Sequence, residues 1–77
     1  MKIYIGNLHH NASEIEIRGL FHDFGTILSI LLYMDTSGRS TGYGYVIMKE
    51  RKDGIAAIQK LNGINFMNQF LEIYGLE

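Results

Sequence analysis

Two tyrosines separated by one residue, Tyr43 and Tyr45, lie in the segment TGYGYVIM of residues 41–48. In an extended chain, residues two apart project to the same face, so these two rings would stand side by side. A tyrosine ring is flat and apolar with a polar hydroxyl at its tip, which suits a surface that remains in contact with water. A pair of such rings can hold another flat ring by stacking, provided that the surrounding elements leave the face open.

The first half of the chain contains a strand, a helix and a second strand. Residues 2–8 alternate with period two and end in Gly-Asn and Leu, which predicts a strand followed by a turn. Ser13 and Glu16 form a capping box ahead of apolar residues at helical spacing, so a helix is expected from about Ser13 to Phe24. Gly25 ends that helix, and residues 26–34, TILSILLYM, predict the second strand.

The second half repeats the alternation in the order strand, helix, strand. The polar residues 35–42 are typical of a hairpin turn, and residues 43–49 predict a third strand. Apolar residues within 55–61 are spaced as in a helix, which Asn62-Gly63 stops, and residues 70–76 predict the last strand. The predicted fold class is therefore α+β and ferredoxin-like, βαββαβ, with a four-stranded antiparallel sheet and two helices packed on one face. The 77 residues suffice for one domain, expected to span residues 1–77.

Strand parity divides the sheet residues into two faces, because one face must meet the helices. The aliphatic face, expected to form the core, contains Ile3, Ile5, Ile30, Leu32, Val46, Met48, Leu71 and Ile73. The opposite face contains Lys2, Tyr4, Leu31, Tyr33, Tyr43, Tyr45, Ile47, Lys49, Glu72 and Tyr74, and thus all five tyrosines. The rings without a hydroxyl, Phe21, Phe24, Phe66 and Phe70, are expected inside.

The composition excludes several classes of site. No cysteine is present, so disulfides and thiolate metal sites are absent, and His9, His10 and His22 lack the spacing of a metal site. The formal net charge of −1 gives no basic field for a polyanion. No apolar stretch approaches the roughly 20 residues of a membrane span, and no secretory signal is visible. The expectation is a soluble cytoplasmic protein, or a nuclear one in a eukaryote, without cofactor or metal.

Two segments resemble the RNA recognition motif family. Residues 3–8, IYIGNL, are similar to the hexapeptide on its first strand, and residues 41–48 resemble the octapeptide on its third. The resemblance covers essentially the whole chain, residues 2–76. It implies a single-stranded RNA-binding module in which bases stack on Tyr4 and Tyr45 while Tyr43 packs against sugars. It also implies that Gly42 and Gly44 leave room beside the rings.

Other residues of the same face would assist such binding. Tyr33 and Tyr74 could extend the stacking platform, and Lys2, Arg39 and Lys49 could approach phosphates. Two positions depart from the family pattern, because Thr41 replaces a Lys or Arg and Gln69 replaces an Arg that relatives often carry. RNA binding is therefore expected to be weaker than the aromatic motif alone suggests.

Two alternatives use the same fold differently. A protein-interaction or dimerisation domain would dock its partner on the apolar face, an interpretation favoured by the net acidity, Thr41, Leu31 and Ile47. Acylphosphatases share this order of elements, but the resemblance would require an arginine in the loop after the first strand, and residues 7–12 contain none. No catalytic residues, small-molecule substrate or membrane partner are therefore expected.

Overall fold

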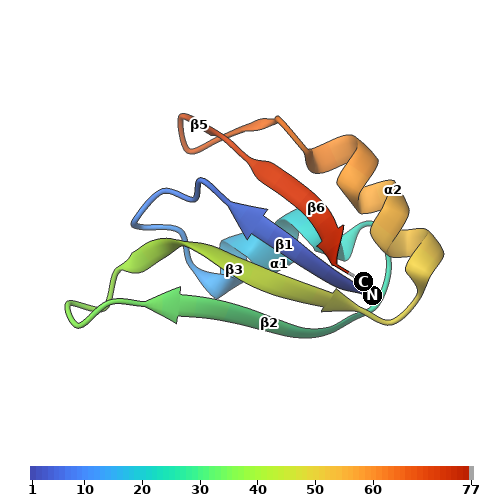
Figure 1. Ribbon diagram of the computed structural model, residues 1–77, viewed down its shortest axis with the longest axis horizontal. Helices are drawn as coiled ribbons and strands as arrows, with labels where there is room; N and C mark the ends of the chain where they lie inside the picture. The colour runs from blue at the N-terminus through green and yellow to red at the C-terminus, as the bar shows by residue number, and fades with distance from the viewer. Residues whose placement is uncertain (77) are drawn as a thin grey trace.

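The computed structural model describes residues 1–76 and confirms the predicted fold class. Four antiparallel strands form one sheet in the order β2-β3-β1-β6, and two further strands, β4 and β5, form a small separate hairpin. In Figure 1 the sheet lies toward the viewer and α1 is seen behind it. The elements are β1 (Lys2–Gly6), α1 (Glu14–His22), β2 (Ile27–Met34), β3 (Ser40–Met48), α2 (Arg51–Leu61), β4 (Asn65–Phe66), β5 (Gln69–Phe70) and β6 (Glu72–Leu76).

The first helix begins where its capping box predicts. Ser13 is the N-cap, its hydroxyl oxygen accepts from the Glu16 backbone N–H, and its own backbone N–H donates to Glu16 Oε1 over 3.0 Å. These bonds satisfy backbone groups that the first turn leaves free. The helix ends at His22, two residues earlier than expected, and Asp23 is the C-cap.

The core lies between the sheet and the helices, and strand parity identified its residues correctly. Phe21 and Ile17 of α1 and Ala57 of α2 are fully buried against the inner face of the sheet. Of the eight sheet residues expected there, Leu32 is half-buried and the others are buried: Ile3, Ile5, Ile30, Val46, Met48, Leu71 and Ile73. Since each buried aliphatic side chain contributes roughly 1.5–3 kcal/mol, this burial fixes the phase of all four strands.

The segment before the last strand departs from expectation. Residues 65–70 form the β4–β5 hairpin, and the last strand begins at Glu72 rather than at Phe70. Met67 and Asn68 take positive φ angles of 55° and 67°, as a two-residue hairpin turn requires. Phe70 was expected inside and is instead 65% exposed, because this hairpin carries it away from the core.

The room that Gly42 and Gly44 leave beside the rings stays a prediction, and the structure adds a backbone role for each glycine. A Cβ on Gly44 would lie 2.5 Å from the carbonyl oxygen of Leu31, so this glycine allows close approach of the β2 backbone. Gly42 has a φ of 102°, a conformation that a side chain disfavours, and it lies where the β2–β3 register shifts. The glycine that the Tyr4 ring covers is Gly6, on the same strand.

A paired substitution tests this close approach. Gly44→Ala should lower the free energy of unfolding by about 1–3 kcal/mol, because the added methyl group meets backbone that cannot rotate away. Gly19→Ala is the matched control, since a Cβ on this exposed glycine of α1 meets nothing within 4 Å. It should raise the free energy of unfolding by about 0.5–1 kcal/mol through helix propensity. Urea unfolding measures both, and an unchanged stability for Gly44→Ala would contradict the packing described.

Candidate functional site

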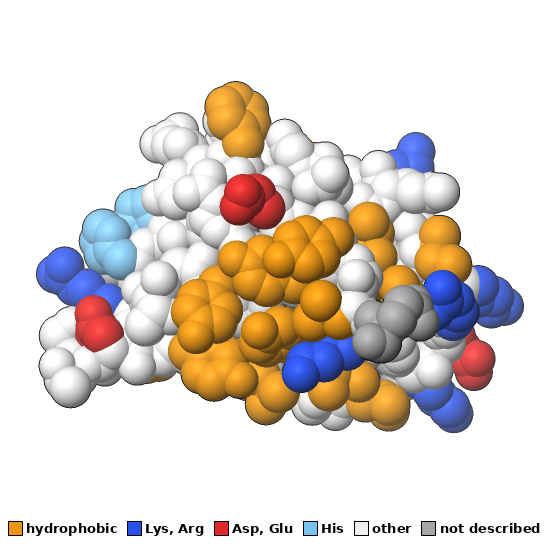
Figure 2. All heavy atoms as spheres, in the orientation of Figure 1, with side chains coloured by type: hydrophobic (Ala, Val, Ile, Leu, Met, Phe, Trp, Pro, Cys, Tyr) orange, Lys and Arg blue, Asp and Glu red, His pale blue; other side chains and the backbone are white. Residues whose placement is uncertain are grey.

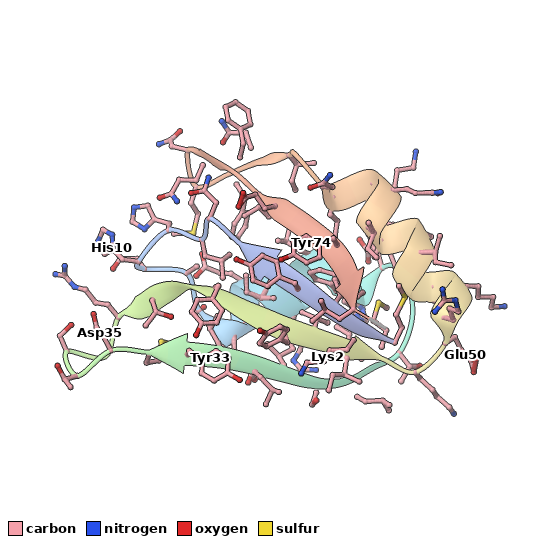
Figure 3. The ribbon with its side chains drawn as sticks, viewed as in Figure 1. Lys2, His10, Tyr33, Asp35, Glu50 and Tyr74 are labelled. Carbon is pink, nitrogen blue, oxygen red and sulfur yellow. The ribbon has the colours of Figure 1, made fainter. Side chains whose placement is uncertain are left out.

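Four tyrosines, one from each strand of the main sheet, form a row across its open face. Tyr74 of β6 lies 4.6 Å from Tyr4 of β1, measured between ring centroids, with 23° between the ring planes. Tyr4 lies 6.3 Å from Tyr43 of β3, which in turn lies 5.2 Å from Tyr33 of β2. The planes in these two pairs are also within 30° of parallel, at 21° and 29°. Figure 3 labels the two end members, Tyr33 and Tyr74.

Tyr45 stands across this row rather than in it. Its ring is nearly perpendicular to those of Tyr33 and Tyr43, at 90° and 86°, and lies 6.0 Å from Tyr4 at 67°. The ammonium group of Lys2 lies over the Tyr45 ring, 4.4 Å from its centroid, in a cation–π contact. The five rings and Lys2 therefore form one contiguous cluster, called here the tyrosine face.

The register of the sheet brings these side chains together. Tyr4 is directly opposite Tyr45 on one neighbouring strand and Tyr74 on the other, and Leu31 is opposite Tyr45. Residues directly opposite in an antiparallel pair project to the same face with Cβ atoms about 4.5–5.5 Å apart. Strand parity alone predicts that the rings share a face, and the register adds that they touch.

A bulge in β3 sets the position of Tyr43. The register between β2 and β3 shifts beyond Leu32, and Gly42 takes its positive φ there. The Gly42 backbone N–H donates to the Ser40 hydroxyl, and its carbonyl accepts from the Leu8 N–H. Thr41 donates its hydroxyl to the carbonyl oxygen of Tyr33 over 3.0 Å. The residue that replaces the family's cation thus links β3 to β2.

The tyrosine face is exposed and mainly apolar. Tyr33, Tyr43 and Tyr74 are 43%, 39% and 51% exposed, and Tyr4 and Tyr45 are half-buried among them. Leu31, also exposed, lies opposite Tyr45, and the half-buried Ile47 follows Tyr45 along β3, so both extend the apolar surface beside the rings. Figure 2 shows the result as a continuous hydrophobic area over the sheet, with a basic side chain at its edge. A flat ligand could contact this area without any rearrangement of the core.

The cations predicted to assist are spread along the sheet. Lys2 is part of the ring cluster, whereas Arg39 and Lys49 flank the two opposite ends of β3. Arg39 belongs to the β2–β3 turn, where its backbone N–H donates to Asp35 Oδ1 over 3.1 Å. That turn is closed by Asp35, whose pKa is lowered chiefly by the hydrogen bond from the Ser37 hydroxyl. Arg39 and Lys49 therefore lie on opposite sides of the row of rings, along the direction of β3, and not at the two ends of the row.

A hydrogen-bonded cluster fastens the β4–β5 hairpin to the end of β1. Gln69 donates from Nε2 to the backbone oxygen of Asn7 over 2.8 Å, and Asn7 donates from Nδ2 to the carbonyl oxygen of Phe70 over 2.8 Å. Asn7 takes a positive φ of 58°, which asparagine tolerates better than most residues. Gln69, which stands where relatives often carry an arginine, thus has a structural role that no pattern in the sequence indicates.

Comparison with known proteins agrees with this architecture. The family model for the RNA recognition motif matches residues 3–72. The chain is 35% identical to the protein RbpD of Nostoc sp. over 74 residues, which covers 95% of this chain and 79% of that protein. The chain belongs to the RNA recognition motif family. Human Probable RNA-binding protein 23 is also 35% identical over 74 residues, but the match spans only 17% of its length.

Solved structures of RNA recognition motifs and related proteins share the fold. The crystal structure of RNA binding protein PG1 superposes with a TM-score of 0.92 at 34% identity, covering 100% of this chain and 95% of that one. An RNA recognition motif solved with bound RNA (GU) superposes with a TM-score of 0.88 at 24% identity, covering 95% and 79% of the two chains. At that identity the second likeness concerns the fold alone.

Other kinds of site receive no support as candidates. Membership of the RNA recognition motif family agrees with the prediction that the protein is not an enzyme. Among residues 1–76, no three His, Cys, Asp or Glu side chains are grouped to hold a metal ion. The rings of His9 and His10 stack on each other at 4.3 Å, and His9 Nδ1 accepts from the Asn11 N–H within the loop. No helix in this described part is long and apolar enough to cross a membrane.

The surroundings of Tyr4 in the folded domain change the pKa of its hydroxyl group. Burial among the other rings raises the pKa of Tyr4, and the nearby Tyr74 and Glu72 raise it further. Glu72 lies on β6 directly opposite Gly6, the residue that the Tyr4 ring covers. Parity had placed Glu72 on the tyrosine face without giving it a role. Its charge next to Tyr4 is the electrostatic feature of the site that sequence reasoning missed.

The pKa of Tyr4 gives a test of this geometry. Glu72→Gln should lower the pKa of Tyr4, because it removes a negative charge that opposes formation of the phenolate. The pKa of Tyr4 in the folded protein exceeds the value of about 10 for an unfolded chain. The contribution of Tyr4 to stability is therefore complete below pH about 10 and is lost as the pH rises through the folded-state pKa. An NMR titration of the Tyr4 ring measures this pKa in the wild type and in Glu72→Gln. An unchanged pKa in the variant would show that Glu72 does not lie close to Tyr4.

Proposed function

We propose that this protein binds single-stranded RNA, with bases stacked on the tyrosine face, and that it acts as a binding module without catalysis. The observation that carries the proposal is the row of four rings across four strands, with Tyr45 beside it. Every base has a flat π face, and stacking on an aromatic side chain contributes about 1–3 kcal/mol per base. The RNA-binding names of the relatives support the same ligand. The proposed location of the protein is therefore the cytoplasm, or the nucleus of a eukaryotic cell, where such RNA occurs.

The proposed roles follow the family pattern residue by residue. Tyr4 and Tyr45 each stack a base, and Tyr43 packs against the sugars between them. Tyr33 and Tyr74 extend the platform to neighbouring nucleotides at its two ends. Lys2 leaves the Tyr45 ring when a base arrives and turns to a phosphate, which costs the roughly 0.5–1 kcal/mol of an exposed cation–π contact.

Electrostatics contribute little to this binding mode. Thr41 supplies no charge, and Lys2, Arg39 and Lys49 are the three cations proposed to reach phosphates. Three such contacts correspond to a slope of roughly −2 for the logarithm of the binding constant against that of the salt concentration. The net charge of −1 adds no attraction at long range. Stacking therefore supplies most of the proposed affinity.

A second candidate function uses the same surface for a protein. Leu31 and Ile47 place aliphatic side chains beside Tyr45, where they cannot form hydrogen bonds with base edges. An exposed apolar surface with aromatic residues is also typical of the centre of a protein interface. A partner protein or a second copy of this chain would then cover the tyrosine face in place of RNA.

Substitution of Tyr45 separates ring stacking from other contributions. Tyr45→Ala should weaken binding of a short single-stranded RNA about 5- to 150-fold, the equivalent of about 1–3 kcal/mol. Tyr45→Phe keeps the ring and should retain affinity within about threefold, which makes it the matched control for the hydroxyl. Fluorescence anisotropy at low salt measures the affinities, and circular dichroism checks that both variants are folded. Unchanged affinity in a folded Tyr45→Ala protein would exclude the proposed stacking.

A sedimentation experiment addresses the second candidate directly. If the apolar face joins two copies, the sedimentation coefficient of the protein rises with concentration, and Tyr45→Ala abolishes the rise. If RNA is the ligand, the protein remains monomeric over the same range and the RNA titrates to saturation.

A further inference from the structure

Among residues 1–76, Glu72 alone places a carboxylate on the otherwise apolar and basic tyrosine face. Glu72 is exposed on β6, on the same side of the strand as Tyr74, and is directly opposite Gly6 of β1. No hydrogen bond or ion pair to its side chain occurs among residues 1–76. A free carboxylate on a surface that receives RNA would repel phosphates, so its presence there calls for a ligand group that donates hydrogen bonds.

The ring of Tyr4 brings the proposed stacking position next to this carboxylate. A Cβ on Gly6 would meet the hydroxyl and ring carbons of Tyr4, so the ring extends along β1 from its own position toward the Gly6–Glu72 pair. The charge of Glu72 raises the pKa of the Tyr4 hydroxyl, in agreement with this proximity. A base stacked on Tyr4 would thus present one of its edges toward Glu72.

The charges on the face leave Glu72 available for a base. Lys2, the cation of the ring cluster, lies at the other end of β1, opposite Leu76 and over the ring of Tyr45. It does not neutralise Glu72, and it provides the end of the face where a phosphate fits best. The tyrosine face therefore has a basic end at Lys2 and an acidic end at Glu72, with Tyr4 between them.

The hydrogen-bonding pattern of the four bases decides which one suits a carboxylate. An ionised carboxylate has two oxygens that only accept, and paired charge-assisted hydrogen bonds are the strongest. The Watson–Crick edge of guanine offers two adjacent donors, N1–H and the 2-amino group. Adenine and cytosine each offer one amino group beside an acceptor nitrogen, and uracil offers one N–H between two carbonyl oxygens. Guanine alone can engage both carboxylate oxygens without a repulsive neighbour.

We propose that Glu72 makes the Tyr4 end of the tyrosine face a guanine-selective subsite, its two oxygens accepting from N1–H and the 2-amino group of a guanine stacked on Tyr4. This inference rests on the proposed RNA binding and adds a base preference to it. A carboxylate at an outward position of the last strand is the only signal of this subsite in the sequence.

The experiment compares uridine-rich RNAs that differ at one central nucleotide. The central base is guanine, hypoxanthine, adenine, cytosine or uracil, and affinities are measured by fluorescence anisotropy. Wild-type protein should bind the guanine RNA about tenfold more tightly than the all-uridine RNA, with hypoxanthine between them because it lacks the 2-amino group. Glu72→Gln should abolish this preference by weakening guanine binding about tenfold, while uridine binding stays equal or improves.

Glu50→Gln is the matched control for the change in charge. Glu50 is the N-cap residue of α2, forms no capping hydrogen bond through its side chain, and lies far from the labelled tyrosines in Figure 3. This variant has the same net charge as Glu72→Gln and should keep the guanine preference.

Two outcomes would overturn the inference and leave the proposed RNA binding in place. If Glu72→Gln raises the affinity for all five RNAs by the same factor, Glu72 acts only by repelling phosphates. If the wild type binds all five equally while Tyr45→Ala still weakens binding, the proposed RNA binding stands and the guanine subsite does not. Failure of every RNA to bind the wild type would instead refute the proposed function, and the subsite with it.

Discussion

The structure depends on one constraint, namely that its helices cover only one side of a four-stranded antiparallel sheet. Each strand must direct its aliphatic residues toward Phe21 and Ile17 of α1 and the buried residues of α2. Because side chains alternate along a strand, burying one set fixes where the other set points. Ile3 and Ile5 on the inner side thereby put Tyr4 outside, and Val46 does the same for Tyr45. The exposed row of rings is a consequence of core packing.

The charges determine how this surface can work. The ammonium group of Lys2 lies over the Tyr45 ring in the free protein, and the Glu72 carboxylate lies next to the Tyr4 ring. A ligand that stacks on both rings must therefore displace Lys2 from the Tyr45 ring and donate hydrogen bonds to the Glu72 carboxylate. We propose that this surface gains affinity from ring contact and discriminates among ligands by their polar edges. It differs from a basic groove, which gains affinity from phosphates and is indifferent to the bases they carry.

Much of this could be predicted from alternation and capping signals, which act over a few residues. The order of elements, the inner face and the outward tyrosines are confirmed, because each depends on local pattern and burial. The exposed Phe70 was placed wrongly, since its position depends on a hairpin that Asn7 and Gln69 fasten from across the fold. The close approach of strands at Gly44 was not predicted for a similar reason, because the backbone it accommodates belongs to another strand. Contacts between distant segments leave no periodic signal in a single sequence.

The most direct test of the central claim is an NMR titration of the protein with short single-stranded RNA at low salt. We expect that ring and amide signals of Tyr4, Tyr43 and Tyr45 shift to saturation, while amides on the outer surfaces of α1 and α2 do not move. A silent sheet, with shifts confined to the helices, would show that the tyrosine face is not where RNA binds.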